Sequence, residues 1–85
     1  MINADQLFED AGYTKMIDQT NYISFFNSKK QTEIDYDLEN EIINIGTDTG
    51  EIVFNNRIYK STDLTMLELY AIMEKAKELR FSNDN

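Results

Sequence analysis

The spacing of hydrophobic residues changes along this chain, and each spacing predicts a different kind of element. Near the N-terminus the spacing is helical, with Asn3 as a capping residue and Gly12 as the left-handed residue that ends a helix. We therefore expect a short helix within 2–13, with Tyr13 packing back onto Phe8 in a Schellman motif. Its apolar side consists of Leu7, Phe8 and Ala11.

From Tyr13 onward hydrophobic and polar residues alternate, which is the two-residue period of a strand. The clearest case is 31–38, where Ile34, Tyr36 and Leu38 are expected to face a core and the residues between them are acidic. The short intervals between strands predict antiparallel pairing, because a parallel crossover needs about a dozen residues. The predicted strands are 13–17, 21–27, 31–38 and 42–45.

After these strands the pattern is less regular. GTDTG at 46–50 is rich in turn residues and is predicted to be a loop. Two short extended pieces follow at 52–54 and 57–60. They form either a tight hairpin or one irregular edge strand, and the sequence leaves both open.

A capped helix is predicted over 65–80. Thr65 and Glu68 match the capping box, in which each side chain accepts the backbone N–H of the other residue. We expect Glu68 and Lys75 to lie outside the apolar stripe, and either Leu69→Asp or Ile72→Asp to unfold the protein. The stripe predicted to cover the sheet consists of Met66, Leu69, Ile72, Met73, Ala76 and Leu79.

Leu67, Tyr70 and Phe81 lie on a different arc of this helix, where they either contact loops and strand ends or form a second face for a partner. The complete pattern predicts an α+β domain: a short N-terminal helix, an antiparallel sheet of three to five strands, and a C-terminal helix packed on one sheet face. With 85 residues, we expect one domain over 1–85 with a frayed tail at 82–85.

Composition changes this picture mainly through charge. The chain has 16 acidic and 8 basic residues, for a net charge of −8, and no basic residue lies between Lys30 and Arg57. Such a balance disfavours direct binding to nucleic acid and favours a basic protein partner, for example a nucleic-acid-binding protein. The chain has no apolar run of about 18 residues and an acidic start, so we expect no membrane span and a cytoplasmic location.

Catalytic and metal-binding motifs are not found. The chain has no histidine and no cysteine, which removes the commonest general base, metal ligand and thiolate nucleophile. The acidic run that begins at Asp35 lacks the glycine and the glutamate that an EF-hand loop requires. We therefore expect a protein without cofactors, metals or enzymatic activity.

The candidate site is a surface that combines aromatic and acidic residues. Alternation places Tyr22 and Phe26 on one side of their strand, together with the acids of the next strand. Such a surface could bind a basic partner, with aromatic residues at its centre and acids at its rim. In the other interpretation the N-terminal helix covers the aromatic residues and leaves only the acids exposed. The predicted partner-binding residues are Tyr22, Phe26, Glu33, Asp35, Asp37, Glu39 and Glu41.

LFEDAGY near the start, EIDYDL in the middle and TMLELYAIMEKAKEL near the end resemble small phage and prophage proteins of low-GC Gram-positive bacteria. The resemblance implies a mobile-element origin and carries over no catalytic residue. Two functions are compatible with it. The first is an accessory protein-interaction module; the alternative is an acidic inhibitor, similar to anti-CRISPR or DNA-mimic proteins, that occupies the basic nucleic-acid channel of a defence nuclease. Paired acids on one continuous face would favour mimicry, and scattered acids would favour the interaction module.

Overall fold

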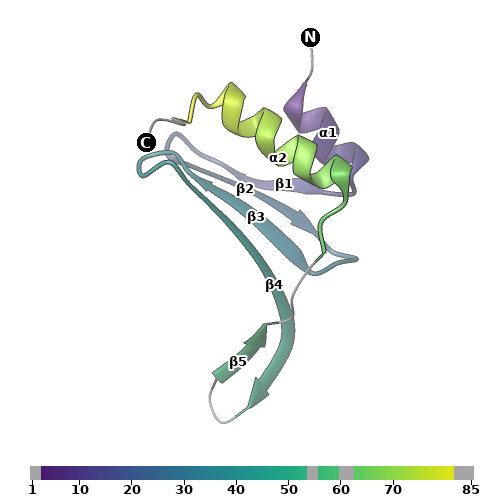
Figure 1. Cartoon of the computed structure of the whole chain (residues 1–85). Helices are drawn as coiled ribbons and strands as arrows, with labels where there is room; N and C mark the ends of the chain where they lie inside the picture. Colours follow the sequence, from purple (N-terminus) through teal and green to yellow (C-terminus); the bar gives the residue numbers. More distant parts are fainter. Residues whose placement is uncertain (1–2, 54–55, 60–62, 82–85) are drawn as a thin grey trace.

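The computed structural model describes residues 3–53, 56–59 and 63–81, and these form two layers (Figure 1). Helices α1 (Ala4–Asp10) and α2 (Met66–Glu78) lie together on one face of an antiparallel sheet. This confirms the predicted α+β class with a helix packed on one sheet face. The predicted frayed tail, 82–85, lies outside the described residues.

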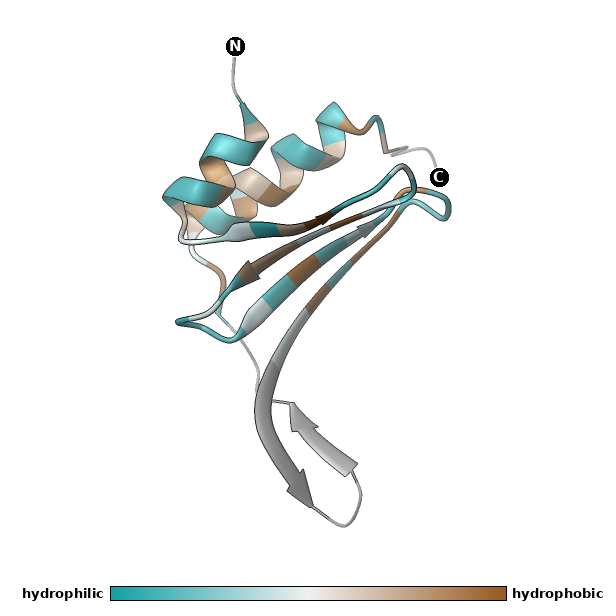
Figure 2. Ribbon diagram, turned by 180° about the vertical axis from the view of Figure 1, so that it is seen from behind, coloured by the Kyte–Doolittle hydropathy of each residue, from teal (hydrophilic) through white to brown (hydrophobic). Residues whose placement is uncertain are grey.

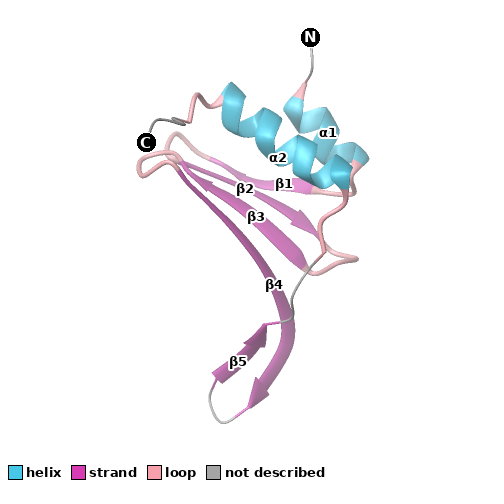
Figure 3. Ribbon diagram, viewed as in Figure 1, coloured by secondary structure: helices cyan, strands magenta, loops and turns pink. Residues whose placement is uncertain are grey.

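The strands form a meander in sequence order, each paired with the next (Figure 3). Three of them match the predicted segments closely, and Figure 2 shows hydrophobic and hydrophilic residues interspersed along the sheet. In β3 the alternation of residue types coincides with an alternation of buried and more exposed positions. The strands are β1 (Thr14–Asp18), β2 (Tyr22–Asn27), β3 (Thr32–Asp37), β4 (Ile42–Val53) and β5 (Asn56–Tyr59).

The predicted loop at 46–50 is wrong, since this segment lies inside β4. Thr47 pairs with Thr32, and their buried hydroxyl groups form a hydrogen bond of 3.1 Å. This contact stabilises the extended conformation beyond Gly46. The far part of β4 then pairs with β5 in a ribbon that projects from the body (Figure 1). The two extended pieces left open by the sequence are therefore the strands of a hairpin over 52–53 and 57–59, while residues 54 and 60 lie outside the described residues.

The two central hairpins are closed by the same device. Asn27 ends β2 and its side-chain oxygen accepts the N–H groups of Lys29 and Lys30 at 3.0 and 3.1 Å. Asp37 ends β3 and accepts the N–H groups of Glu39 and Asn40, both at 3.1 Å. Each loop of four residues thus begins with an Asx turn, which sets the register of the strands on both sides.

Both helices end in a Schellman motif. At the end of α1, Gly12 has φ 96° and the Tyr13 N–H donates to the Phe8 carbonyl at 2.9 Å. Tyr13 packs on Phe8 as predicted, with the ring centroids 5.7 Å apart. At the end of α2, Arg80 has φ 62° and the Phe81 N–H donates to the Ala76 carbonyl at 3.0 Å. In each case the next residue is an aromatic one that packs against the core.

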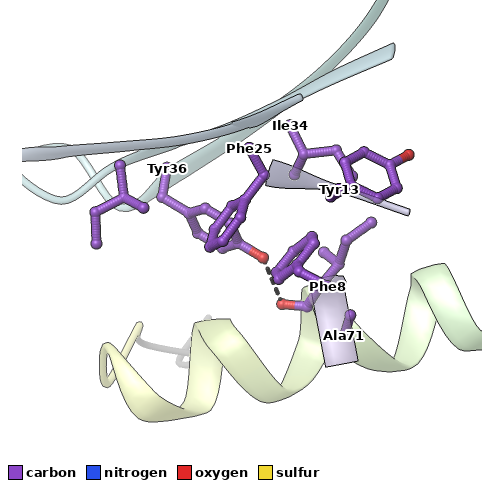
Figure 4. Packing of buried hydrophobic residues seen from close by; sticks show 8 residues of the cluster. Phe8, Tyr13, Phe25, Ile34, Tyr36 and Ala71 are labelled. Carbon is purple, nitrogen blue, oxygen red and sulfur yellow. Dashed lines mark hydrogen bonds between the residues drawn. The ribbon is translucent and has the colours of Figure 1, made fainter. Parts of the chain in front are cut away.

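The core lies between the helices and the inner face of the sheet, and aromatic rings dominate it (Figure 4). The Phe8 ring of α1 stacks on Phe25 of β2 with centroids 3.9 Å apart. Tyr36 of β3 is fully buried between Phe25 and Phe81 and donates its hydroxyl to the Ile72 carbonyl of α2 at 2.9 Å. The rings therefore connect both helices to the two central strands.

The predicted apolar stripe of α2 is only partly correct. Ile72 is buried and Ala76 and Leu79 pack against the core, but Met66, Leu69 and Met73 are exposed. The buried face instead contains Glu68, Ala71, Ile72 and Lys75. The aromatic rings fill the core, so α2 places the small Ala71 against them, and the two buried charges find partners at its margins. The helix is therefore rotated away from the orientation that its hydrophobic residues alone predict.

Candidate functional site

The outer face of the sheet is the face opposite α1 and α2, and among the described residues no helix covers it (Figure 1). The register of β2 and β3 pairs aromatic with acidic residues there: Tyr22 lies opposite Asp37, and Phe26 lies opposite Glu33. Between these two pairs Ser24 lies opposite Asp35. Five of the seven predicted site residues therefore share one face.

The interpretation in which the N-terminal helix covers Tyr22 and Phe26 is wrong. Helix α1 packs on the inner face, where Phe8 stacks on Phe25. Because successive side chains of a strand point to opposite faces, a helix on Phe25 cannot reach Phe26. Tyr22 and Phe26 are each half-buried and so remain partly accessible.

Hydrogen bonds fix the polar groups of this face. The Ser24 hydroxyl donates to Asp35 at 2.6 Å, which holds this half-buried carboxylate at the centre of the face. Burial and a hydrogen bond to Asp35 raise the pKa of Tyr22 to about 12. A hydrogen bond to Asp35, together with burial, raises the pKa of the exposed Glu33 carboxyl to about 7. Near neutral pH this face therefore exchanges a proton at Glu33 and keeps Tyr22 neutral.

The remaining predicted acids have other surroundings. Asp37 caps its hairpin, and hydrogen bonds from the Asn40 side chain and backbone and from the Glu39 backbone lower its pKa. Glu39 and Glu41 lie in the loop between β3 and β4, at the end of the outer face and not on it. Asp35 and Asp37 thus hold the fold as well as carrying charge, whereas the sequence predicts them only as partner-binding residues.

Two exposed isoleucines flank the acids. Ile17 of β1 lies opposite Ser24, and Ile42 of β4 lies opposite Asp37. Neither isoleucine belongs to the site predicted from the sequence. The alternation of β1 and β4 contains the signal, but using it requires the register between strands, and the register of β1 shifts by a bulge between Lys15 and Ile17. The outer face therefore has an aromatic and acidic centre with aliphatic residues on either side.

A second polar cluster joins the layers. Glu68 is buried and accepts the Tyr13 hydroxyl at 2.6 Å, the Lys30 amine at 2.8 Å and the Thr65 N–H at 2.8 Å. Burial alone would raise the pKa of Glu68, but hydrogen bonds from Lys30, the Thr65 amide and Tyr13 outweigh it and lower the pKa to about 2. The low pKa keeps this carboxylate ionised at neutral pH, and both of its oxygens accept hydrogen bonds, so its role is structural.

Beside α1 lies a hollow of about 290 Å³, and two of the charged residues that line it, Asp5 and Lys15, form ion pairs. Lys15 bonds Asp5 at 2.7 Å and Asp18 at 3.2 Å, and the buried Lys75 bonds the other oxygen of Asp5 at 2.9 Å. These contacts connect α1, β1 and α2. The lining residues are Asp5, Glu9, Tyr13, Thr14, Lys15 and Phe25.

Two features that would indicate a function, a metal site and a membrane-spanning helix, are absent from the described residues. Within residues 3–53, 56–59 and 63–81, no three acidic side chains gather as metal ligands would. In the same part of the chain, neither helix has the length and apolar character needed to cross a membrane. Comparison with family models, curated proteins and solved structures gives no match. The resemblance to phage proteins therefore stays a prediction.

Proposed function

We propose that this chain is a small, acidic, non-catalytic protein-interaction module that binds a basic protein through the outer face of its sheet. The observation that carries the proposal is the register of β2 and β3. It sets Tyr22 against Asp37 and Phe26 against Glu33 on the face that the helices leave open. In keeping with the sequence, we place the module in the cytoplasm and assign it to a phage or mobile element.

The chemistry of the face supports a basic partner. Aromatic residues are enriched at the centres of protein interfaces, and acids around them attract and orient positive charge. The segment between Lys30 and Arg57 contains no base, so its acids have no basic residue nearby in the sequence. A lysine or arginine side chain of a partner could lay its aliphatic stem on Phe26 and its charge against Glu33.

Mimicry of DNA is the weaker candidate, because the acids whose side chains the structure describes are divided between the outer face and ion pairs elsewhere in the fold. Several of them have intramolecular basic partners and are neutralised within the fold. Two of those on the outer face, Glu33 and Asp35, share a hydrogen bond that favours the protonated form of Glu33. Among the described residues, the ion-paired acids include Asp5, Asp18, Glu68, Glu74 and Glu78.

A charge reversal on the outer face tests the proposal. Glu33→Lys changes an exposed residue opposite Phe26, and it is preferable to changes at Asp35 or Asp37 because those carboxylates hold Ser24 and the hairpin turn. Glu9→Lys makes the same charge change at an exposed site on α1 and serves as the control. The partner is first captured from a Gram-positive host lysate, and its affinity for the three proteins is then measured by calorimetric titration.

We expect Glu33→Lys to weaken binding at least tenfold and Glu9→Lys to leave it nearly unchanged. Wild-type binding should also weaken steeply as salt is raised, because the Debye length falls from about 10 Å at 0.1 M to about 3 Å at 1 M. Equal losses for the two variants would refute the outer face as the site. Displacement of the chain from its partner by duplex DNA would instead favour mimicry.

The pKa of Glu33 adds a pH test. Because this carboxyl loses its proton near pH 7, affinity for a basic partner should rise as the pH is raised from about 6 to 8. Glu33→Gln should remove that part of the pH dependence. A pH profile that is identical in the two proteins would mean either that Glu33 does not titrate between pH 6 and 8 or that it does not face the partner.

A further inference from the structure

The solvent side of α2 carries an apolar stripe that no described element covers. Met66, Leu69, Tyr70 and Met73 are 78, 39, 42 and 56% exposed. At about 100° per residue these four side chains span an arc of about 100°, on the side of the helix opposite Glu68 and Lys75. An arc of this width is what a helix normally buries against another element.

The stripe has the same spacing in both directions along the helix. The intervals between its members are three, one and three residues, so its midpoint falls between Leu69 and Tyr70. A two-fold symmetric interface requires one patch that complements itself. In an antiparallel pair of α2 helices centred on this midpoint, Met66 of one copy meets Met73 of the other, and Leu69 meets Tyr70.

The charges at the two ends of α2 favour the same arrangement. Asp63 is exposed just before the helix, while Lys77 and Arg80 are exposed at its end, where Lys77 also forms an ion pair with Glu74 at 2.9 Å. An antiparallel pair places the acid of each copy near the bases of the other and also opposes the two helix dipoles. A parallel pair would set Asp63 against Asp63. A hydrophobic stripe with opposite charges at its ends thus complements a second copy of itself.

We propose that two copies of this chain form an antiparallel, two-fold symmetric dimer through the solvent side of α2. The helix has 13 residues and is about 20 Å long, so the interface is smaller than the roughly 1,600 Å² of a standard complex. The dimer is therefore weak and depends on concentration. The proposal is independent of the outer sheet face, which lies on the other side of the domain and stays open in both copies.

Sedimentation velocity over a concentration series tests the dimer. In moderate salt, which screens repulsion between two copies of charge −8, the wild type should approach twice the monomer mass between about 10 µM and 1 mM. Met73→Lys should raise the dissociation constant at least tenfold. Met16→Lys changes an equally exposed methionine on β1 by the same charge and should stay within twofold of the wild type. A wild type that remains monomeric throughout, or equal effects of both variants, would overturn the proposal.

Disulfide cross-linking tests the orientation, and the natural chain has no cysteine to interfere. A mixture of Met66→Cys and Met73→Cys proteins should form the mixed disulfide between positions 66 and 73 on mild oxidation. Met66→Cys alone should not form a disulfide, because an antiparallel pair separates the two copies of position 66 by about 10 Å along the axis and a disulfide needs Cβ atoms about 4 Å apart. Equally rapid cross-linking of Met66→Cys with itself would contradict the antiparallel arrangement.

Discussion

In most helices that cover a sheet, charged residues face the solvent and large hydrophobic residues face the core. In α2, two charged residues face the core and several large hydrophobic residues face the solvent. The side that meets the core contains Glu68 and Lys75, both almost fully buried, whereas the solvent side contains Met66 and Met73. The buried side is nevertheless well satisfied, because each of its charges has hydrogen-bonded partners. A small aromatic core can thus hold a helix through a few apolar contacts and specific polar ones, and leave its larger hydrophobic residues available for another contact.

The polar contacts of the buried side come from segments distant in sequence. Tyr13 lies 55 positions before Glu68, Lys30 lies 38 positions before it, and Asp5 lies 70 positions before Lys75. Buried ion pairs add little net stability compared with apolar packing, but breaking one leaves a charge without a partner. Each pair therefore penalises any other rotation of α2, which explains how a helix with two hydrophobic sides adopts one orientation.

The largest expected effect is a loss of unfolding free energy, and it should differ between two aliphatic residues of α2 that are three positions apart. Ile72→Asp places a charge among core residues and should cost about 3–5 kcal/mol, a large part of the 4–13 kcal/mol expected for a domain of this size. Leu69→Asp, at a position 39% exposed, should cost only about 1 kcal/mol. Urea denaturation followed by circular dichroism measures both. Similar losses would mean that α2 packs as its hydrophobic residues alone predict.

The next effect concerns the buried carboxylate. Glu68→Ala removes the acceptor of the Tyr13 hydroxyl, the Lys30 amine and the Thr65 N–H, and should lower the free energy of unfolding by about 3 kcal/mol. Glu74→Ala breaks the ion pair with Lys77 on the same helix and should change the free energy of unfolding little. A loss at Glu68 no greater than that at Glu74 would show that the buried pair does not hold α2.

Lowering the pH should remove the stabilising contribution of Glu68. The pKa of Glu68 is lowered to about 2 in the folded chain from an unfolded value of 4.5, so its stabilising effect is complete above pH 4.5 and is lost as the pH falls toward 2. The difference in unfolding free energy between wild type and Glu68→Gln should shrink over that interval. Glu33, whose pKa is raised, acts in the opposite direction between pH 4.5 and 7 and is common to both proteins. A constant difference from pH 5 to pH 2 would contradict the ionised, fully bonded state of Glu68.

Much of the fold could be predicted from the sequence because its signals are local. Alternation located Ile34 and Tyr36 in the core, and Gly12 marked the end of α1. The outer-face residues of β2 and β3 were grouped correctly because a short hairpin leaves little freedom of register. The same reasoning failed at 46–50, where turn-forming residues lie in a strand whose pairing with Thr32 is a longer-range feature.

The rotation of α2 could not be predicted in this way. Residue type alone assigned Leu69 and Met73 to the core, since nothing local shows that Tyr13 and Lys30 converge on Glu68. The capping box held part of the signal: a glutamate fixed to the Thr65 N–H is less free to remain in solvent. The candidate site shows a similar division, because strand alternation placed Tyr22 and Phe26 but could not supply the register that brings Ile17 beside Ser24, or the hydrogen bond between Ser24 and Asp35.

The smallest expected effect is at the end of α2, where the backbone anchors the helix in its observed rotation. Arg80 has φ 62°, a left-handed conformation that favours glycine, while Phe81 beyond it packs against Tyr36.

Arg80→Gly should relieve the strain at this position without disturbing the Phe81 contact, whereas Arg80→Ala loses the same positive charge and keeps a β-carbon. The glycine variant should therefore be more stable than the alanine variant by about 1 kcal/mol, a difference of roughly 4–8 °C in Tm for a domain of this length. Thermal denaturation at micromolar concentration, below the range of the proposed dimer, measures the difference. An alanine variant as stable as the glycine variant would mean that the Schellman motif does not hold α2, and that its orientation rests on the buried charges alone.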